Sequence, residues 1–560
     1  MSNLPVIVGY GGISPAGRSI FDFSHKRMLY EVLDSSDQEE VIKSLGYLMG
    51  TSDKKYILKK SLIRTIDEDF FLQHNLRNPE LPTYAGGQLP SGFNPAETYN
   101  SRQHPRSLAM TIFGISDAVK SLGISWDEIL KIVPREKIGC ISGCAVAQAD
   151  KFGMGGMFQA SMAGSRVTSK HMAMSLGEGS ADFGHAYVLG SMGMTGNYTG
   201  ACATFQYNLK IGTSIIQSGE ALICIVGAAE SGIVPEIYEA FSATKGLAED
   251  KHLLDLQKRL GEDCSQPNHR KICRPFGENI GMSLGESAQF VILMADELAI
   301  KLGLNIHGSA LASHINADGY KKSISGPGAG NYLTVGKCLN QIENYFGKEA
   351  LNKTFFHAHG TSTPQNRESE SHIISSLAKT FNINALPVTA IKSYLGHSLA
   401  AAGGDQIIST LGSWKNNWIP GITSTPALAE DVYSENLNFL LKNLEFNDAN
   451  FDFAILNAKG FGGNNGTALI ASPNKTMKML EVKHSTETIK KYYPKNEKIQ
   501  KKLEVEKINI LSGEIKSRYM FGEDVINGLT DFQIEKNQIV NKVTDEKFSL
   551  DSTLPYKDFL

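Results

Sequence analysis

Short apolar runs alternate with stretches of helical periodicity along most of this chain. The run ALICIVG at 221–227 is continuously apolar, which is typical of a strand buried on both faces of a parallel sheet. Further strands are expected at 6–9, 137–142, 288–295, 310–315, 353–359, 386–391, 453–457 and 467–471, and helices through 118–122, up to 217, over 335–346 and from about 398. Strands that alternate with helices predict an α/β layered fold with mixed, largely parallel sheets.

This rhythm of strands and helices recurs in the second half of the chain, which suggests a duplicated architecture. We expect an N-terminal half over 1–305 and a C-terminal half over 306–473. The mixed, polar stretch 21–106 interrupts the N-terminal half as an insertion, for which we expect a role at a subunit interface. From 474 to 560 the composition shifts to Lys, Glu, Asn and Ile, and the Lys-rich stretch 478–507 shows little apolar periodicity. We therefore expect a charged C-terminal appendage that wraps the surface, with docking of an acidic carrier as the alternative.

Composition and charge exclude several classes of function. A formal net charge of -3 lacks the basic excess that phosphate binding requires, so nucleic acid is not expected as a partner. No apolar run approaches the ~20 residues that a membrane-spanning helix needs, and the first residues lack the pattern of a signal peptide. The 7 Cys residues are odd in number and show no repeated CxxC spacing, which favours reduced thiols in a cytoplasmic protein.

Cys202 is the first candidate for chemistry. It lies between Ala201 and Ala203, directly before a predicted helix. The positive end of a helix dipole and its free N–H groups favour a thiolate, so we expect a lowered pKa and a nucleophilic sulfur. From this feature alone, a buried structural cysteine remains the alternative.

Two histidine motifs follow predicted strands in the C-terminal half. His357 and His359 are two residues apart, and residues at that spacing on a strand share a face. They form either a metal-ligating pair or one catalytic histidine with a structural neighbour, and a third ligand at metal spacing is not evident. Lys392 and His397 lie on a strand-to-helix turn, where a cation and a histidine suit stabilisation of an oxyanion. Taken alone, His397 could equally be an ordinary residue at a helix start.

The glycine-rich stretch GFGGNNG at 460–466 superficially resembles a dinucleotide-binding loop. It leads into a strand-like run instead of a helix, which argues against that assignment. We expect a flexible flap whose backbone N–H groups face a reacting carbonyl, with Phe461 as a bulky gate.

Together and in this order, these motifs resemble the β-ketoacyl-[acyl-carrier-protein] synthases of the thiolase superfamily. The motifs that carry the resemblance are ACAT at 201–204, HGTSTP at 359–364, Lys392 with GHS at 396–398, and GFGG at 460–463. The resemblance runs from about 6 to 472, and the opening residues and the long chain are similar to a bacterial variant that primes fatty-acid synthesis from acetyl-CoA. It implies the duplicated αβαβα layered fold of that superfamily and a homodimer.

The resemblance also implies a role for each motif. Cys202 would be the acyl acceptor, and His359 and His397 would be the decarboxylation pair. The supporting residues that it implies are Lys392 and Glu370 as a charged pair, the amides of Cys202 and Phe461 as an oxyanion hole, and Thr361, Thr363, Gly462 and Gly463 at the substrate.

The implied reaction is a decarboxylative condensation. Cys202 takes an acyl group from acyl carrier protein or coenzyme A, malonyl-acyl carrier protein loses CO2, and the resulting carbanion attacks the Cys202 thioester. The expected partners are therefore acyl carrier protein and acetyl-CoA, and no cofactor or metal is required. Alternatives are a polyketide-type ketosynthase, another thiolase-superfamily acyltransferase, a non-catalytic partner subunit, which normally loses the nucleophile, and a metal-dependent hydrolase that uses His357 and His359.

This chain departs from the family pattern at several positions. Arg367 stands where the family usually has Asp, Gln406 where it has Glu, and Lys459 where it has an aromatic residue. The usual Arg-Asp-Gly-Phe run is altered to NIGM at 279–282. We expect these changes to affect the acid network, the gate and the choice of substrate.

Overall fold

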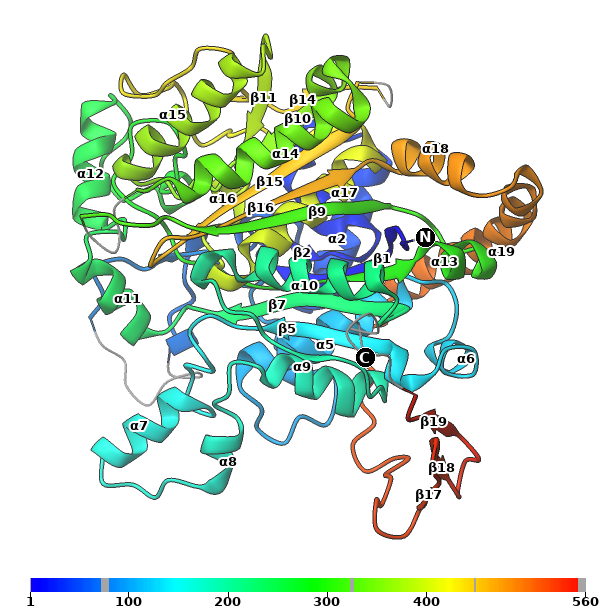
Figure 1. The fold of residues 1–560 in the computed structure, drawn as a ribbon. Helices are drawn as coiled ribbons and strands as arrows, with labels where there is room; N and C mark the ends of the chain where they lie inside the picture. The colour runs from blue at the N-terminus through cyan, green and yellow to red at the C-terminus, as the bar shows by residue number, and fades with distance from the viewer. Residues whose placement is uncertain (1, 72–79, 323–326, 448–449, 552–560) are drawn as a thin grey trace.

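A computed structural model describes residues 2–71, 80–322, 327–447 and 450–551. One long mixed sheet runs through its centre in the order β13-β11-β10-β15-β16-β9-β1-β8-β7-β5-β6, and β2 pairs with β1 beside this path (Figure 1). Its strands in the first half are β1 (Pro5–Ser14), β2 (Gly17–Arg18), β5 (Ile138–Gly143), β6 (Thr195–Gly196), β7 (Ile223–Ser231) and β8 (Glu286–Ala295). Those in the second half are β9 (Gly308–Ala317), β10 (Thr354–His357), β11 (Leu386–Thr389), β13 (Leu437–Phe439), β15 (Phe453–Gly460) and β16 (Asn464–Ala471).

The pairing of these strands confirms a mixed sheet and a duplicated architecture. Parallel pairs lie at the two ends of the sheet, where β5 pairs with β6 and β7, and β10 pairs with β11 and β15. From β7 through β8, β1, β9 and β16 to β15, every neighbouring pair is antiparallel. Each half therefore consists of parallel strands followed by two antiparallel ones, and parallel pairing is confined to the ends of the sheet.

Helices complete the predicted layers. α10 (Thr204–Ser218) contacts both β7 and β9, and α17 (Ala402–Asn416) contacts both β8 and β15, so these two helices lie between the halves. Figure 1 shows α10 between β9 and β7. α5 (Arg106–Lys120) covers β1 and β8, and α14 (Gly330–Phe346) covers β9 and β16. This is the αβαβα arrangement expected from the sequence.

Shorter elements surround these layers. They are α6 (Trp126–Leu130), α7 (Met154–Met162), α8 (Ser169–Ala173), α9 (Gly179–Phe183), α11 (Pro235–Ala243), α12 (Asp250–Arg259), α13 (Asp296–Leu302), α15 (Pro364–Thr380), α16 (Lys392–Leu395), β12 (Trp418–Ile419) and β14 (Leu444–Glu445). Within the part of the chain that the structure describes, no helix combines the length and the apolar character needed to cross a bilayer.

The predicted insertion contributes helices and part of the core. It contains α1 (Phe23–Met28), α2 (Ser35–Met49), α3 (Lys54–Lys59) and the short antiparallel pair of β3 (Arg64–Thr65) and β4 (Ala85–Gly86). Three of its buried side chains, Ile66, Phe70 and Phe71, belong to the apolar cluster that also contains Cys202. The stretch is therefore joined to the body of the protein by apolar packing, and its role at a subunit interface stays a prediction.

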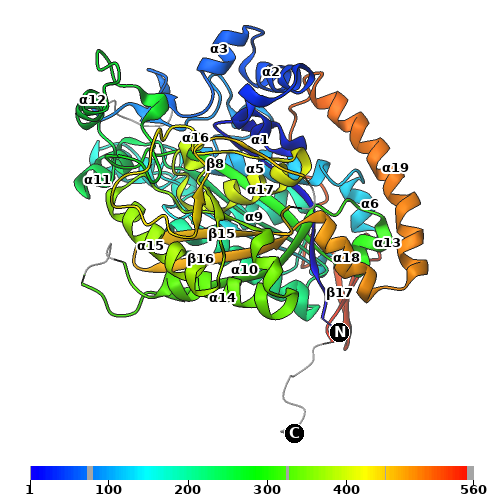
Figure 2. The ribbon, with the colours of Figure 1, turned by 90° about the horizontal axis from the view of Figure 1, so that it is seen from above.

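The C-terminal appendage also has a buried side. It consists of α18 (Pro473–Lys483), α19 (Thr486–Ile510) and a small sheet of β17 (Phe532–Ile534), β18 (Gln538–Asn541) and β19 (Lys547–Ser549). Figure 2 shows α19 along the side of the molecule. Its buried residues are Ile489, Tyr492, Ile499, Leu503 and Ile510. The expectation of little apolar periodicity is wrong, because these residues form one helical stripe within a Lys-rich sequence.

Candidate active site

Cys202 lies where the sequence places it, on a tight turn at the start of a helix. It is the middle residue of the 3₁₀ turn η6 (Ala201–Ala203), which leads directly into α10. Ala201 has a left-handed backbone with φ of 50°, and such strain in a non-glycine residue often accompanies function. The Thr204 hydroxyl accepts the Gly200 N–H at 3.1 Å and donates to the Ala201 carbonyl at 2.7 Å. These bonds fix the turn that carries the sulfur.

The electrostatic environment of the thiol differs from the expectation. Burial raises the pKa of Cys202 to about 11, although the Lys392 charge and the backbone amides of Phe461 and Cys202 pull it downward. The predicted lowering of the pKa by the helix terminus is wrong, because desolvation of the thiolate outweighs these attractions. The same two amides point at the sulfur, however, which is the arrangement expected of an oxyanion hole.

A glycine brings the predicted flap against this turn. Gly460 ends β15, and a Cβ built on it would lie 2.2 Å from the Gly200 carbonyl oxygen and 3.1 Å from the Cys202 nitrogen. Only glycine allows this close approach. Gly462 and Gly463, in the loop between β15 and β16, have φ of 85° and 89°. The loop is therefore built for a sharp reversal directly above the thiol.

Phe461, the predicted gate, lies in the loop between β15 and β16. Its side chain is 47% exposed, and its ring lies 5.7 Å from that of Phe241 on α11, centroid to centroid. The ring is therefore partly open to solvent, while the backbone amide of the same residue faces Cys202.

The two candidate histidines contact each other, and the Lys392 charge that acts on Cys202 also acts on both rings. His359 follows β10 and His397 follows α16, and their ring centroids are 5.2 Å apart at an interplanar angle of 86°. Burial lowers the pKa of both rings well below the ordinary value, and the nearby Lys392 charge lowers each further. Both imidazoles are therefore neutral at physiological pH and have one N–H each to donate.

Lys392 fixes the tautomer of His359. Its Nζ lies 3.4 Å from His359 Nδ1 and donates to the His359 carbonyl at 2.5 Å. An ammonium group can only donate, so Nδ1 accepts and the proton of the neutral ring lies on Nε2.

Glu370 binds the backbone N–H groups of the same segment, 359–360. Its carboxylate accepts the backbone N–H of His359 at 2.7 Å and that of Gly360 at 2.9 Å. The side-chain amides of Asn366 and Asn457 donate to it at 2.9 and 2.7 Å. The structure thus brings Lys392 and Glu370 to the same backbone segment. The two asparagines escaped the sequence analysis because neither stands in a motif with a recognisable pattern.

The two predicted substrate-binding threonines flank a strained serine. The hydroxyls of Thr361 and Thr363 are 3.2 Å apart, and Thr363 caps the N-terminus of α15. Ser362 has φ of 65° and accepts the Arg274 N–H on its hydroxyl at 2.7 Å. This turn therefore presents two hydroxyls directly after His359.

His397 has its own support, which the sequence analysis missed. Asp405, buried on α17, accepts hydrogen bonds from Ser398 at 2.5 Å, Ser287 at 2.6 Å and Gln289 at 2.9 Å. The backbone N–H of His397 donates to the Ser283 carbonyl at 2.7 Å. The sequence did contain a signal for Asp405, which is a carboxylate inside an Ala-rich helix. A buried charge requires hydrogen-bonding partners such as these.

The residues that depart from the family pattern make structural contacts of their own. Arg367 forms a bidentate pair with Asp431 at 2.7 and 3.0 Å. Gln406 donates to the carbonyls of Ala358 at 3.0 Å and Asn457 at 2.9 Å. The Lys459 ammonium donates to the Ser369 hydroxyl at 3.0 Å. Asn279, at the altered 279–282 run, donates to the Arg274 carbonyl at 3.2 Å.

The alternative use of His357 in a metal site lacks a ligand set. Its ring is fully buried, and within the described residues neither ring nitrogen has a hydrogen-bond partner. Across those same residues, no group of three or more His, Cys, Asp or Glu side chains is arranged to hold a metal ion. The His357 ring lies 5.6 Å from the Phe355 ring, centroid to centroid, and its role as a structural neighbour stays a prediction.

The fold and this constellation of cysteine, two histidines and lysine define a condensing enzyme of the thiolase superfamily. Comparison with known families agrees: residues 108–299 match the N-terminal domain of β-ketoacyl synthases and residues 307–425 match the C-terminal domain. The chain belongs to the β-ketoacyl synthase family, and it is an acyltransferase of the 3-oxoacyl-[acyl-carrier-protein] synthase class.

Individual proteins of this family are similar to the chain over most of its length. The chain is 37% identical to the β-ketoacyl-[acyl-carrier-protein] synthase FabY of Pseudomonas aeruginosa over 94% of this chain and 95% of that protein. It is 26% identical to the chloroplastic 3-oxoacyl-[acyl-carrier-protein] synthase I of Arabidopsis thaliana over 70% of this chain and 78% of that protein. The crystal structure of the ketosynthase FabY from P. aeruginosa superimposes with a TM-score of 0.93 at 35% identity, covering 100% of this chain and 99% of that one.

Proposed function

We propose that Cys202 holds the growing acyl group and that His359 and His397 drive the condensation. The observation that supports this most directly is that the backbone amides of Phe461 and Cys202 both face the Cys202 sulfur, while the Lys392 charge acts on that sulfur and on both neutral histidine rings. Amides placed in this way stabilise the oxyanion that forms when a thiol attacks a thioester carbonyl.

In the first half-reaction, the Cys202 sulfur attacks the carbonyl carbon of an acyl thioester. The carbonyl electron pair moves onto oxygen, where the Cys202 and Phe461 amides receive it. The donor C–S bond then breaks, and the departing thiolate takes up the proton that Cys202 loses. The high pKa of the free thiol makes this oxyanion stabilisation and the Lys392 charge the main sources of activation.

In the second half-reaction, a malonyl thioester binds beside the acylated sulfur. The bond from its terminal carboxylate to the α-carbon breaks and releases CO2, and the electron pair forms an enolate. The Nε2–H of His359 and the neutral ring of His397 donate to the enolate oxygen. The α-carbon then attacks the Cys202 thioester, the C–S bond breaks, and a β-ketoacyl product two carbons longer leaves.

The remaining assignments follow from position. The hydroxyls of Thr361 and Thr363 and the backbone of Gly462 and Gly463 would contact the arm that carries the substrate, because the threonines closely follow His359 and the glycines directly follow Phe461. Malonyl-acyl carrier protein is the proposed second substrate, with acetyl-CoA or an acyl-acyl carrier protein as primer. The FabY relative carries the acyl carrier protein in its name. The divisions at 305 and 473, a homodimer and a cytoplasmic location stay predictions.

Mass spectrometry of the intact protein tests the split of roles. Acetyl-CoA should add one acetyl group to the wild type and none to Cys202→Ser, whereas Cys264→Ser, which removes an exposed cysteine, should acylate normally. His359→Ala and His397→Ala should still acylate but form no β-ketoacyl product from malonyl-acyl carrier protein. An acetyl group on Cys202→Ser would contradict the assignment of the nucleophile.

A gain of activity tests the enolate step separately. Cys202→Gln should release CO2 from malonyl-acyl carrier protein without condensation, because the oxyanion amides and both histidines remain. Its combination with His359→Ala should release none. CO2 release that persists in the double variant would contradict the two-histidine mechanism.

A further inference from the structure

Lys459 is a cationic residue to which the mechanism above gives no role. It departs from the family pattern, and it is the last but one residue of β15. Gly460, which follows it, packs against the Cys202 turn, and the amide of the next residue, Phe461, faces the sulfur. The charge of Lys459 acts on the His359 ring. The ammonium group therefore belongs to the surroundings of the proposed reaction.

The contacts of Lys459 also place it beside the segment that carries His359. Its Nζ donates to the Ser369 hydroxyl at 3.0 Å, and this hydroxyl donates in turn to the Asn366 carbonyl at 3.4 Å. The next residue of α15, Glu370, accepts the backbone N–H of His359 at 2.7 Å. In addition, β15 and β10 are parallel neighbours in the sheet. Two separate connections, one through α15 and one through the sheet, thus bring Lys459 next to this segment.

The protein compensates the charge of Lys459 only in part. Among the residues that the structure describes, the half-buried ammonium group forms no ion pair, and its hydrogen-bond partner is a neutral hydroxyl. The Glu370 and Asp318 carboxylates act on it without contact, and the Lys321 charge opposes them. Hydrogen bonds from other groups already occupy the oxygens of both carboxylates. An ammonium group has three N–H donors, so two of them have no acceptor among these residues and suit an anionic ligand.

The two substrates of the proposed reaction differ by a negative charge at the reacting end. A malonyl thioester carries a carboxylate two bonds from the carbonyl carbon whose oxygen the two histidines would bind, whereas an acetyl thioester carries none. We propose that Lys459 binds this carboxylate and thereby selects the malonyl thioester as the second substrate. The proposal rests on the proposed function, because it concerns the substrate that His359 and His397 would decarboxylate.

This contact would contribute to binding and not to the chemical step. When the bond between the carboxylate and the α-carbon breaks, its electron pair passes to the enolate, and the departing CO2 is neutral. The charge that Lys459 binds is therefore lost during the reaction, and the contact is stronger in the ground state than in the transition state. Its removal should raise KM without lowering kcat.

Initial rates of condensation at saturating acetyl-CoA test this with Lys459→Met, which removes the charge and keeps most of the side chain. KM for malonyl-acyl carrier protein should rise about tenfold or more, since a hydrogen bond to a charged group contributes about that factor, and kcat should not fall. Acetylation of Cys202 by acetyl-CoA, which carries phosphates but no such carboxylate, should stay within about twofold of wild type. Lys459→Arg should restore most of the affinity, because it retains the charge.

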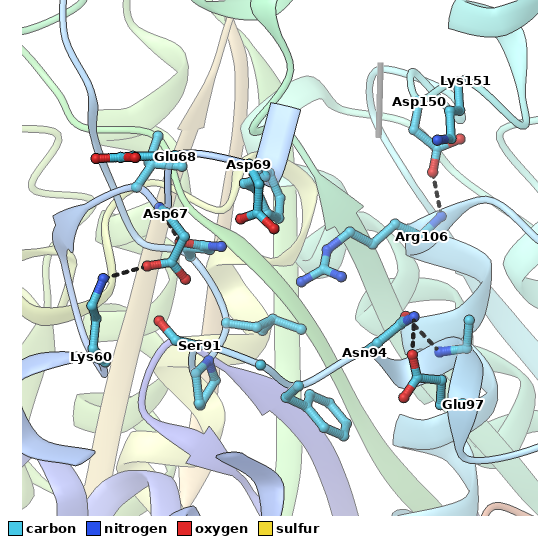
Figure 3. A pocket seen from close by; sticks show the side chains of 18 of the residues that line it. Lys60, Asp67, Glu68, Asp69, Ser91, Asn94, Glu97, Arg106, Asp150 and Lys151 are labelled. Atoms are coloured by element: carbon cyan, nitrogen blue, oxygen red, sulfur yellow. Dashed lines mark hydrogen bonds and ion pairs between the residues drawn. The ribbon is translucent and has the colours of Figure 1, made fainter. Parts of the chain in front are cut away.

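Lys60→Met is the matched control. Lys60 lines a cavity of about 1020 Å³ between the insertion and the body of the N-terminal half, and Figure 3 shows it paired with Asp67, at 2.6 Å. None of the proposed catalytic side chains, all of which are in the described part of the chain, lines this cavity. The control removes a lysine charge outside the site, so KM and kcat should both match the wild type.

A second variant covers the case in which Lys459→Met does not fold, as judged by circular dichroism. Lys459→Gln keeps a hydrogen-bond donor for Ser369 but carries no charge. It should raise KM for malonyl-acyl carrier protein in the same direction by less, again with normal acetylation.

Three results would overturn the proposal. They are an unchanged KM in a folded, uncharged Lys459 variant, a fall in kcat at unchanged KM, and an equal loss of acetylation by acetyl-CoA. The last would mean that Lys459 contacts a group that both substrates share. A wild type that is not acetylated, or that forms no β-ketoacyl product, is a different result. It would overturn the proposed function, and this proposal with it.

Discussion

Glu370 holds His359 by its backbone and not by its ring. The carboxylate accepts the His359 N–H at 2.7 Å, while Lys392 contacts the carbonyl and the ring of the same residue. The imidazole that we propose to be catalytic is therefore positioned by hydrogen bonds to the peptide units on either side of its Cα, which leaves Nε2 for the proposed substrate.

This relationship predicts the effect of Glu370→Gln. Each carboxylate oxygen accepts one backbone N–H and one asparagine N–H. The amide replaces one of these oxygens by an N–H donor, so two buried N–H groups lose their acceptor, at a cost of about 1–3 kcal/mol each. We expect a lower midpoint of urea unfolding and a condensation rate that falls more than the rate of Cys202 acylation. Equal losses in both half-reactions would show that Glu370 does not act through His359. Glu368→Gln, two residues earlier on α15, is the control and should behave like the wild type.

Gly460 is expected to tolerate no side chain. In Gly460→Ala, the Cβ would have to move away from the Gly200 carbonyl, 2.2 Å distant, and this shifts the Phe461 amide from the sulfur. Loss of one oxyanion donor should slow acylation by about 10²–10³-fold. The control is Gly336→Ala in α14, where the nearest atom is 3.6 Å from the added carbon and helix propensity favours Ala. Normal acylation by the Gly460 variant would contradict this account of the flap.

The raised pKa of Cys202 predicts a steep pH dependence of alkylation by iodoacetamide. With a thiol pKa of about 11, the thiolate fraction rises about tenfold per pH unit between pH 7 and 9. Measurement in a Cys264→Ser background removes an exposed competing thiol. Lys392→Met should slow alkylation at each pH, because the charge that lowers this pKa is lost. A rate that levels off below pH 8 would mean that the thiol ionises more readily than its burial implies.

Buried His357 should make the protein less stable in acid. Burial lowers its pKa to about 3, below the value of about 6.5 expected in the unfolded chain. The unfolded state therefore binds the proton more tightly, and stability is lost as the pH falls from about 6.5 toward 3. Between pH 7.5 and 5.5 this residue accounts for a loss of about 1.4 kcal/mol.

Urea unfolding at pH 7.5 and at pH 5.5 measures the contribution of His357 to this loss of stability. His357→Leu should reduce the difference in unfolding free energy by about that amount, whereas the same change at the exposed His252 should not. An unchanged pH dependence in His357→Leu would show that the ring is not buried in its neutral form.

The buried stripe of α19 predicts that the appendage contributes to global stability. Leu503 is 6% exposed in the core, and Val505 on the same helix is 58% exposed. Leu503→Ala should cost about 2–5 kcal/mol of unfolding free energy, and Val505→Ala less than about 0.5 kcal/mol. Similar small effects in both variants would show that the helix is only loosely attached.

The sequence by itself determined the layered fold and the candidates for the reactive groups. Continuous apolar runs mark buried strands wherever they occur, and β7 is an example with every residue buried. Cys202, His359 and His397 could be chosen because each stands in a short motif whose chemistry depends on its nearest neighbours in the chain. Such local signals survive without knowledge of the tertiary structure.

What only the tertiary structure decided depends on residues that are distant in the sequence. The pKa of Cys202 reverses the local expectation because burial of the thiol outweighs the backbone amides and the Lys392 charge. Asn457 reaches Glu370 across 87 positions, and Asp405 reaches Ser287 across 118. The apolar stripe of α19 could not be recognised among the lysines of this segment, because the core residues that it packs against are distant in the sequence. The burial of a group, its distance from other residues and the charges near it depend on how the elements pack. They cannot be derived from any single stretch of the chain.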